Sequence, residues 1–303
     1  MMLRLRKSEP VDTVSFFSKM LWGQPSFYRD IPITAYHFGK DSVYVDEYIG
    51  PEDKPEKKAY KLSPQIKGPS AMIIHKRFWL GTDIYGRDLL SRLLLGTRVS
   101  LSVGMMSVII SMLLGVSIGA IAGYFGGWID AVLSWLMNIL WALPALLLVI
   151  ALSFALGKGL WQIFIAVGLS MWVEVARLVR GQVLSLKQVE YIEAARSLGF
   201  NNTRIIIRHI LPNIIGPILV LASSNFAAAI LLEAGLSFLG FGAQPPMPTW
   251  GSMIKEHYGY IVMDSAYLAI IPGLAIMFLV YAFNLVTVGL RDAFDIKSQS
   301  TRF

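Results

Sequence analysis

The sequence predicts an all-α membrane protein with five transmembrane helices and a small polar N-terminal segment. The 303-residue chain is 55% hydrophobic, only 16% of its residues are charged, and its mean hydropathy is +0.56. A soluble domain carries about 25% charged residues, so this composition argues against a soluble enzyme. The apolar residues also form long uncharged runs, each long enough for the ~20 residues that span a bilayer. Buried helices of a soluble protein rarely stay uncharged over such a length.

The first 97 residues differ from the rest and contain no run that spans a bilayer. More than half of the chain's 27 Lys and Arg lie there, and no apolar signal-peptide core follows the early cations. The alternation of apolar and polar residues at 42–46 indicates a short strand. We therefore expect residues 1–80 to form a small polar segment outside the cytoplasm.

The membrane part is expected at residues 81–295, where five apolar runs follow one another. They cover residues 99–123, 131–156, 160–176, 214–242 and 266–290. The connection at 177–211 is rich in Lys and Arg, which places it in the cytoplasm. The connection at 243–265 contains one cation, Lys255, and suits the outer side. Residues 296–303 then form a cytoplasmic tail.

Several residues of the predicted spans stand out as candidates for gating or helix packing. Gly115, Gly119 and Gly123 recur every four residues and leave one helix face bare, so a second helix can approach closely. Pro144 is expected to kink the second span, which serves either a gate or packing. An acid inside a bilayer is costly, and for Glu233 we expect a structural hydrogen bond or a gate rather than substrate binding.

The cytoplasmic connection shows helical patterning. Residues 190–198 are mostly good helix formers, and Gly199 offers a left-handed stop. Ile192, Ala195 and Leu198 follow one another at helical spacing. Small side chains at Ala194 and Ala195 would let a partner surface come near. The alternative is a solvated, positively charged loop that binds no partner.

At these residues the sequence resembles the inner-membrane permease subunits of ABC importers. Their cytoplasmic signature is E-A-A, three residues, G, nine residues and I-x-L-P, with His209 here in place of the Ile. The matching residues are Glu193, Ala194, Ala195, Gly199, Leu211 and Pro212. The resemblance implies the type I importer permease (MetI-like) fold, and it implies that this loop is the coupling helix that docks on an ATPase subunit.

Further stretches are similar to the second (C-type) permease subunit of the oligopeptide, dipeptide and nickel group. They lie at residues 81–88, 176–183, 233–242, 244–251 and 283–294. Members of that group typically cross the membrane once before the G-T-D motif, which here begins at Gly81. No such helix precedes Gly81 in this sequence. We therefore expect that the chain as given starts late or descends from a shortened gene.

The resemblance implies a permease of the bacterial inner membrane that forms half of a path for peptides. Its partners would be a homologous permease, two ATPase subunits that use ATP and Mg²⁺, an external binding protein and membrane lipids. The sequence has no phosphate-binding loop, and we expect no catalytic residue, bound cofactor or metal in this chain. The positive charge is explained by orientation and by the ATPase-facing loop, so no nucleic-acid partner is expected.

Alternatives to a peptide permease remain open. Peptide cargo is preferred over nickel or another small solute, because no cluster of His or acids lines the predicted helices. An ion-coupled secondary transporter needs coupling acids within its spans, where only Glu174 and Glu233 occur. A membrane anchor that merely scaffolds other proteins would leave the specific loop pattern without a role.

Overall fold

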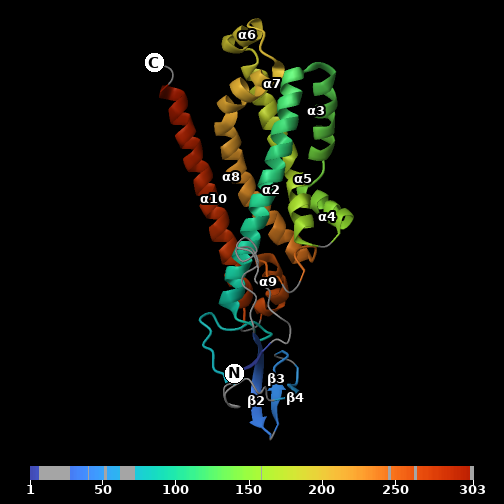
Figure 1. Ribbon diagram of the computed structural model, residues 1–303, viewed down its shortest axis with the longest axis vertical. Coiled ribbons are helices and arrows are strands. Elements are labelled where there is room, and N and C mark those ends of the chain that lie inside the picture. The colour runs from blue at the N-terminus through green and yellow to red at the C-terminus, as the bar shows by residue number, and fades with distance from the viewer. Residues whose placement is uncertain are drawn as a thin grey trace.

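The protein is a long helical bundle with a small β-sheet at one end (Figure 1). The computed structural model describes these residues: 1–6, 28–39, 41–50, 53–61, 72–157, 159–244, 247–262 and 265–300, with side chains up to Phe294. Parts of the expected polar segment lie outside the described residues, as do residues 245–246 of the 244–251 motif and residues 301–303 of the expected tail.

A five-stranded antiparallel sheet precedes the bundle, with the strand order β4-β3-β2-β1-β5. The strands are β1 (Met2–Arg6), β2 (Tyr28–Phe38), β3 (Ser42–Glu47), β4 (Glu56–Lys61) and β5 (Ile73–Ile74). Alternate residues bury one apolar cluster, formed by Leu3, Ile31, Ile33, Val43, Val45 and Met72. The predicted strand at 42–46 is confirmed as β3. The other four strands are additions to the all-α prediction.

The predicted spans correspond to helices of the bundle. Four helical stretches are long and apolar enough to cross a membrane, namely α2 (Leu89–Phe125), α5 (Leu160–Leu186), the stretch Asn202–Leu239 and the Tyr267–Phe294 part of α10 (Tyr267–Ser300). A fifth crossing is formed if α3 (Gly127–Trp141) and α4 (Ala145–Leu156) count together as one bent span. Each of the five predicted apolar runs overlaps one of these segments, and only residues 240–242 and Ala266 lie just outside them.

The second span is broken rather than kinked, which corrects the expectation for Pro144. Helices α3 and α4 meet at an angle of 96°, and Pro144 is the residue directly before α4. Its carbonyl accepts a hydrogen bond from the Leu148 N–H at 3.1 Å. Proline has no N–H to continue α3, and it disfavours helical backbone at the preceding residue. The chain therefore ends one helix and begins another.

The fourth span begins with three short helical pieces. They are α7 (Asn202–Arg204), the π-helical turn η2 (Ile205–Ile210) and the 3₁₀ turn η3 (Leu211–Ile214), which lead into α8 (Ile215–Leu239). The Leu211 N–H donates to the Ile206 carbonyl, five residues back. Pro212 has no N–H, so an ordinary helical ladder cannot pass through this point.

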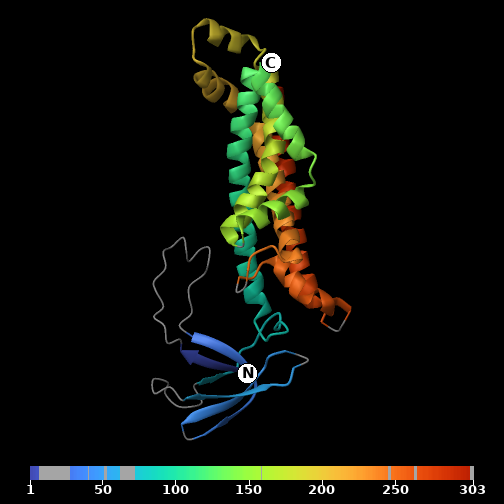
Figure 2. The same cartoon turned by 90° about the vertical axis from the view of Figure 1, so that its right-hand side faces the viewer.

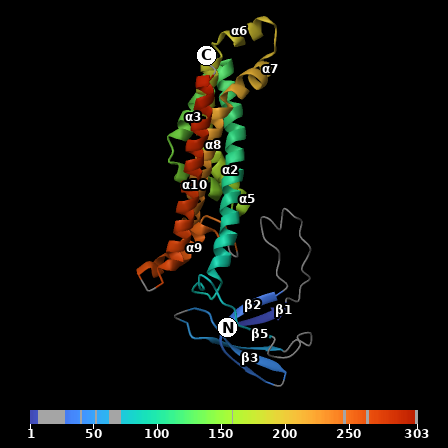
Figure 3. The same cartoon turned by 90° about the vertical axis from the view of Figure 1, so that its left-hand side faces the viewer.

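The two ends of the bundle carry different elements. Helix α6 (Glu190–Ser197) and the end of α10 lie at one end (Figure 2). Helix α9 (Trp250–His257), the turn η4 (Tyr258–Val262) and the sheet lie at the other (Figure 3). This arrangement agrees with five crossings, in which α3 and α4 count as one bent span. An odd number of crossings places the described N-terminal and C-terminal parts of the chain at opposite ends.

Candidate functional sites

Helix α6 projects beyond the bundle (Figure 2). It ends in a left-handed turn at Gly199. Gly199 has a φ of +78°. Its N–H donates to the Arg196 carbonyl at 3.0 Å, and the Phe200 N–H donates to the Ala195 carbonyl at 3.2 Å. These two bonds are the Schellman arrangement that closes helices at a left-handed glycine. The chain therefore turns back toward the bundle directly after α6.

The two faces of α6 have different surroundings. Ile192 and Ala195 are buried and pack in one apolar cluster with Ile205 and Ile210 of η2. The exposed side chains of α6 and of its end include Tyr191, Glu193, Ala194 and Leu198. Ala195 therefore does not present a small residue to a partner, which corrects that part of the sequence interpretation. Its small size instead lets α6 lie against its own chain.

Leu211 and Pro212 lie in η3, where the loop enters the fourth span. The neighbouring Asn213 ties this turn to α6, because its side-chain amide donates to the Tyr191 hydroxyl at 3.3 Å. His209 stands where the family signature has Ile, and its ring stacks on Phe200. The six signature residues thus belong to one unit, in which α6 rests on the base of the fourth span. We call α6, Gly199, Phe200 and the turns η2 and η3 the loop unit.

The glycines of α2 allow its backbone to touch α5. A methyl group added to Gly123 would lie 2.8 Å from the Arg180 carbonyl oxygen and 2.9 Å from Val183 Cβ. One added to Gly119 would meet the Ala176 carbonyl oxygen, and one added to Gly115 would meet Val175. Such close approach is typical of helix pairs with small residues in the contact. Because α5 leads directly into α6, this contact fixes the helix that carries the loop unit.

Glu233 is fully buried within the bundle. Its carboxylate accepts a hydrogen bond from the Ser237 hydroxyl at 2.7 Å, one turn along α8. A second hydroxyl, that of Ser100 on α2, lies 3.4 Å from the other carboxylate oxygen. The side chain therefore joins two helices and does not line either of the described hollows of the bundle.

The sequence around these sites is similar to that of a known protein family. Residues 115–298 match the family described as "Binding-protein-dependent transport system inner membrane component". The chain belongs to this family.

Relatives with high identity cover most of the permease. This chain is 45% identical over 234 residues to a glutathione transport system permease protein of Pectobacterium atrosepticum. The aligned residues cover 77% of this chain and 76% of the relative. A dipeptide transport system permease protein of Bacillus subtilis is 40% identical over 256 residues, with 84% and 78% covered.

The fold of the permease also matches a solved structure. The MetNI methionine ABC transporter in an inward-facing conformation gives a TM-score of 0.56 at 18% identity, covering 68% of this chain and 97% of that chain. The MetI-like fold expected from the sequence is therefore confirmed.

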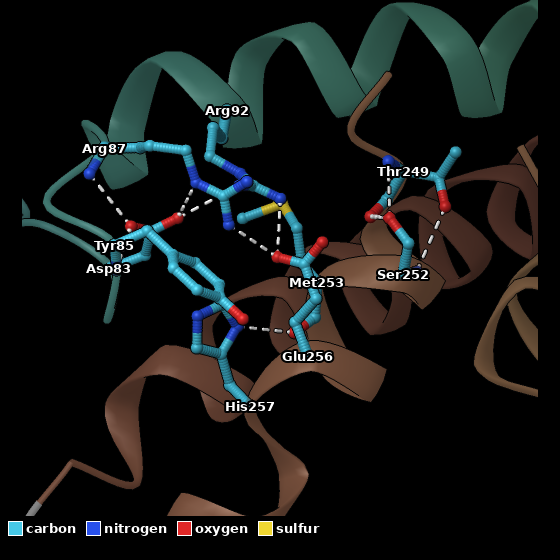
Figure 4. A network of polar contacts seen from close by, with 9 residues as sticks. All are labelled: Asp83, Tyr85, Arg87, Arg92, Thr249, Ser252, Met253, Glu256 and His257. Atoms are coloured by element: carbon cyan, nitrogen blue, oxygen red, sulfur yellow. Dashed lines mark hydrogen bonds and ion pairs between the residues drawn. The ribbon is translucent and has the colours of Figure 1, made fainter. Parts of the chain in front are cut away.

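The permease contains a polar cluster that sequence reasoning missed. Asp83, Arg87, Arg92 and Glu256 join the segment before α2, α2 itself and α9 (Figure 4), and we call these four residues the α9 clasp. The Asp83 Oδ2 atom lies 2.5 Å from Arg87 Nε and 3.0 Å from Arg92 Nη1. The Glu256 Oε2 atom lies 2.7 Å from Arg87 Nη2 and 2.9 Å from Arg92 Nη2. Two guanidinium groups thus bridge two carboxylates.

Burial gives the α9 clasp an electrostatic character unlike that of a surface ion pair. The Asp83 side chain is fully buried, and its second oxygen accepts from the backbone N–H groups of Tyr85 and Arg87 at 2.9 and 2.8 Å. Burial raises the pKa of the Glu256 carboxyl, and the Arg87 charge opposes that shift. The sequence offered little signal for this contact, because Glu256 follows Lys255 directly and its partners lie far away along the chain.

The α9 clasp does not have the character of a metal site, although its two carboxylates and the neighbouring His257 lie close together. Asp83, Glu256 and His257 each place a ligand atom within 4.8 Å of the others. Both carboxylates already accept hydrogen bonds from Arg87 and Arg92. Two fixed positive charges would repel a cation placed between them. The donor set therefore fits an ion-pair network and does not fit a metal.

Proposed function

We propose that this permease forms half of the translocation path for small peptides in an ATP-driven importer. The observation that supports it most strongly is the similarity, at 40–45% identity over at least three quarters of the chain, to permeases named for dipeptide and glutathione transport. These cargoes share an amide backbone, a free amine and a carboxylate. The mostly apolar lining between the helices suits cargo whose side chains vary.

The proposal includes the partners that such a system needs. A homologous permease completes the path, an external binding protein delivers the cargo at the end that carries α9, and two ATPase subunits dock on the loop unit. ATP and Mg²⁺ are bound by the ATPase subunits, and this chain binds no cofactor. The exposed residues Tyr191, Ala194 and Leu198 are the apolar part of the surface offered to an ATPase.

The loop unit is connected both to α5 and to the fourth span, so a movement of α6 can displace both. Three residues, Lys187–Val189, separate α5 from α6, and the buried Ile192 and Ala195 seat α6 on η2. A displacement of α6 on closure of the ATPase pair would therefore act on α5 and on the fourth span together. Nucleotide binding drives such a change only through contacts that differ between the two states. Rigid seating of α6 meets that requirement.

Uptake by the reconstituted importer tests the proposal. The permease, its homologous partner, the ATPase pair and the binding protein are placed in liposomes, and accumulation of a labelled dipeptide and of labelled glutathione is followed. We expect accumulation only with ATP. A Gly199→Asp variant is expected to insert and assemble normally but to lose uptake, whereas Gly199→Asn, which accepts the left-handed turn better, retains most of it. Normal uptake by the Asp variant would refute the docking role, and accumulation without ATP would refute the importer.

A further inference from the structure

Glu174 lies near the middle of α5 with its side chain exposed on the surface of this chain. Helix α5 begins at Leu160, and at a rise of 1.5 Å per residue Glu174 lies about 21 Å further along the helix axis. It therefore lies deep within the span. Among the residues that the structure describes, none donates a hydrogen bond to its carboxylate or forms an ion pair with it. An acid at this depth is costly against lipid. Its position therefore requires surroundings other than hydrocarbon.

The cation closest along the helix does not neutralise Glu174. Arg177 lies one turn further on α5, and its Nη2 donates to the Asn138 side-chain carbonyl of α3 at 2.7 Å. The same guanidinium covers the ring of Trp141, 4.6 Å from its centroid. Arg180, a further turn along, pairs with Asp130 at 2.5 Å. Both arginines thus hold α3 against α5 and leave the acid free.

A hollow of about 480 Å³ opens beside Glu174. Its walls come from the break between α3 and α4, from α5 and from α8. The residues include Leu140, Trp141, Leu143, Ser170, Glu174 and Leu231. Apart from Glu174 and Ser170 the lining is apolar. The free carboxylate is therefore the only charged group among the described residues that line this hollow.

The broken span gives an independent reason to assign this face to the cargo path. Residues 142–144 lie between α3 and α4 and belong to neither helix. Leu143 of this break lines the hollow. Irregular backbone is tolerated at membrane depth only where it is buried in protein or lines a water-filled cavity. An unpaired acid and a broken helix at the same depth both exclude lipid from this face.

We propose that Glu174 is a cargo-binding residue of the translocation path and that it binds the ammonium group of a passing peptide. This inference rests on the proposed function and names the residue that would contact the cargo. A single carboxylate in an apolar hollow attracts a cationic amine without selecting the side chains beside it. One partly exposed charge pair is weak enough for release, which a transport path needs.

Transport by charge variants tests the proposal in the complete importer. We expect Glu174→Gln to lower uptake of alanyl-norleucine about fivefold, the effect of losing one partly exposed charge pair, and Glu174→Asp to retain most of it. A matched Asp292→Asn substitution on α10, outside every site described above, is expected to leave uptake unchanged. If alanyl-lysine falls more than alanyl-norleucine, the lysine ammonium is the ligand; if both fall equally, the ligand is the α-ammonium.

Two results would overturn the inference. Unchanged uptake of both peptides by Glu174→Gln would show that the carboxylate does not contact cargo. Equal losses in Glu174→Gln and Glu174→Asp, with less assembled complex, would show a structural role. A wild-type importer that moves neither peptide would instead refute the proposed function, so the two failures are distinguishable.

Thiol labelling provides a readout that does not depend on transport. The chain contains no cysteine, so a single introduced thiol reports on one position. We expect Glu174→Cys in the assembled complex to react with a cationic, membrane-impermeant methanethiosulfonate and to be protected by alanyl-norleucine. Ser107→Cys, at a fully buried position on α2, is expected to stay unmodified. An unreactive Glu174→Cys would place the residue against lipid or another subunit and would overturn the inference.

Discussion

The ring of His209 stacks on the ring of Phe200, with centroids 5.8 Å apart and planes 15° from parallel. Phe200 directly follows the Gly199 turn, and His209 belongs to the π-helical turn at the base of the fourth span. The stack therefore joins the end of α6 and its glycine turn to the π-helical turn η2. The buried His209 Nε2 has no hydrogen-bond partner among the described residues, so the ring contributes through packing.

Replacing His209 separates packing from polarity. His209→Ala is expected to destabilise the loop unit by about 1 kcal/mol, the typical contribution of an aromatic pair, and to reduce cargo-stimulated ATPase activity of the importer. His209→Phe keeps the stack and removes the unpartnered nitrogen, so it should match or exceed wild-type stability. Thermal unfolding of the complex in detergent measures both variants. Equal destabilisation by Ala and Phe would contradict the packing explanation.

Gly119→Ala tests the contact between α2 and α5. Its new methyl group would meet the Ala176 carbonyl oxygen, which belongs to backbone and cannot swing away. We expect a loss of about 1–3 kcal/mol, as for other overpacked interiors, seen as a lower unfolding temperature. The matched substitution Gly273→Ala in α10 meets no atom within 4 Å and should leave stability unchanged or slightly raised. A stable Gly119→Ala protein would mean that the helices separate without cost.

The α9 clasp predicts unequal roles for its two arginines. The Arg92 side chain is 11% exposed and that of Arg87 is 43% exposed, although both contact the same carboxylates. Arg92→Ala leaves Asp83 and Glu256 without their buried partner and should cost about 2–4 kcal/mol. Arg87→Ala should cost less than about 1 kcal/mol, because solvent already screens it. Hydrogen exchange of α9 amides measures the difference, and equal loosening in both variants would count against this ranking.

The sheet carries a pH-dependent ion pair between directly opposed residues of β1 and β2. The Asp30 carboxylate accepts from Arg4 Nε at 2.8 Å and lies 2.5 Å from Lys76 Nζ. The Arg4 hydrogen bond lowers the pKa of Asp30 to about 2, with a smaller contribution from Lys76. The unfolded carboxyl has a pKa of about 3.9. The stabilisation is therefore complete above about pH 5, and it declines progressively as the pH falls through the unfolded and then the folded pKa, until it is lost near pH 1.

An Asp30→Asn variant reveals how much this pair contributes. We expect the variant to lose about 1–2 kcal/mol of sheet stability at pH 7 and to lack the acid transition of the wild type. Hydrogen exchange of β1 and β2 amides, corrected for intrinsic rates, follows both proteins between pH 7 and pH 3. A wild-type sheet whose protection does not change toward pH 3, relative to the variant, would contradict the assigned cause.

The membrane part could be predicted because hydrophobic runs and cation-rich loops depend on the bilayer rather than on tertiary detail. Uncharged stretches such as 99–123 identify spans regardless of their neighbours. The sheet could not be predicted in the same way, because its strands vary in character. Strand β4 is largely charged and reads as a solvated segment, and β2 contains Pro32. Strand β3 shows the alternation of a half-buried strand. Leu3 and Leu5 of β1 alternate with Arg4 and Arg6 in the same way, but that segment is only five residues long.

The site residues were predicted where a local rule applies. The left-handed turn at Gly199 and the close approach at Gly115, Gly119 and Gly123 follow from the absence of a side chain. The burial of Ala195 could not be read from helical spacing, because spacing identifies a face without saying what covers it. The α9 clasp joins Asp83 to Glu256 across most of the chain, and pairing at such a distance requires the fold.

The π-helical turn at Ile205–Ile210 changes how side-chain directions pass from the loop unit into the membrane. An extra residue in one turn corresponds to about 100° of rotation about the helix axis. The buried residues record it, since Ile205 and Ile210 are five apart whereas Ile214 and Ile218 are four apart. A helical wheel drawn through the whole stretch would therefore place the side chains on one side of the π-helical turn on the wrong face of the helix. The face of the bundle to which each side chain of α8 points must be assigned separately from that of the residues that precede the π-helical turn.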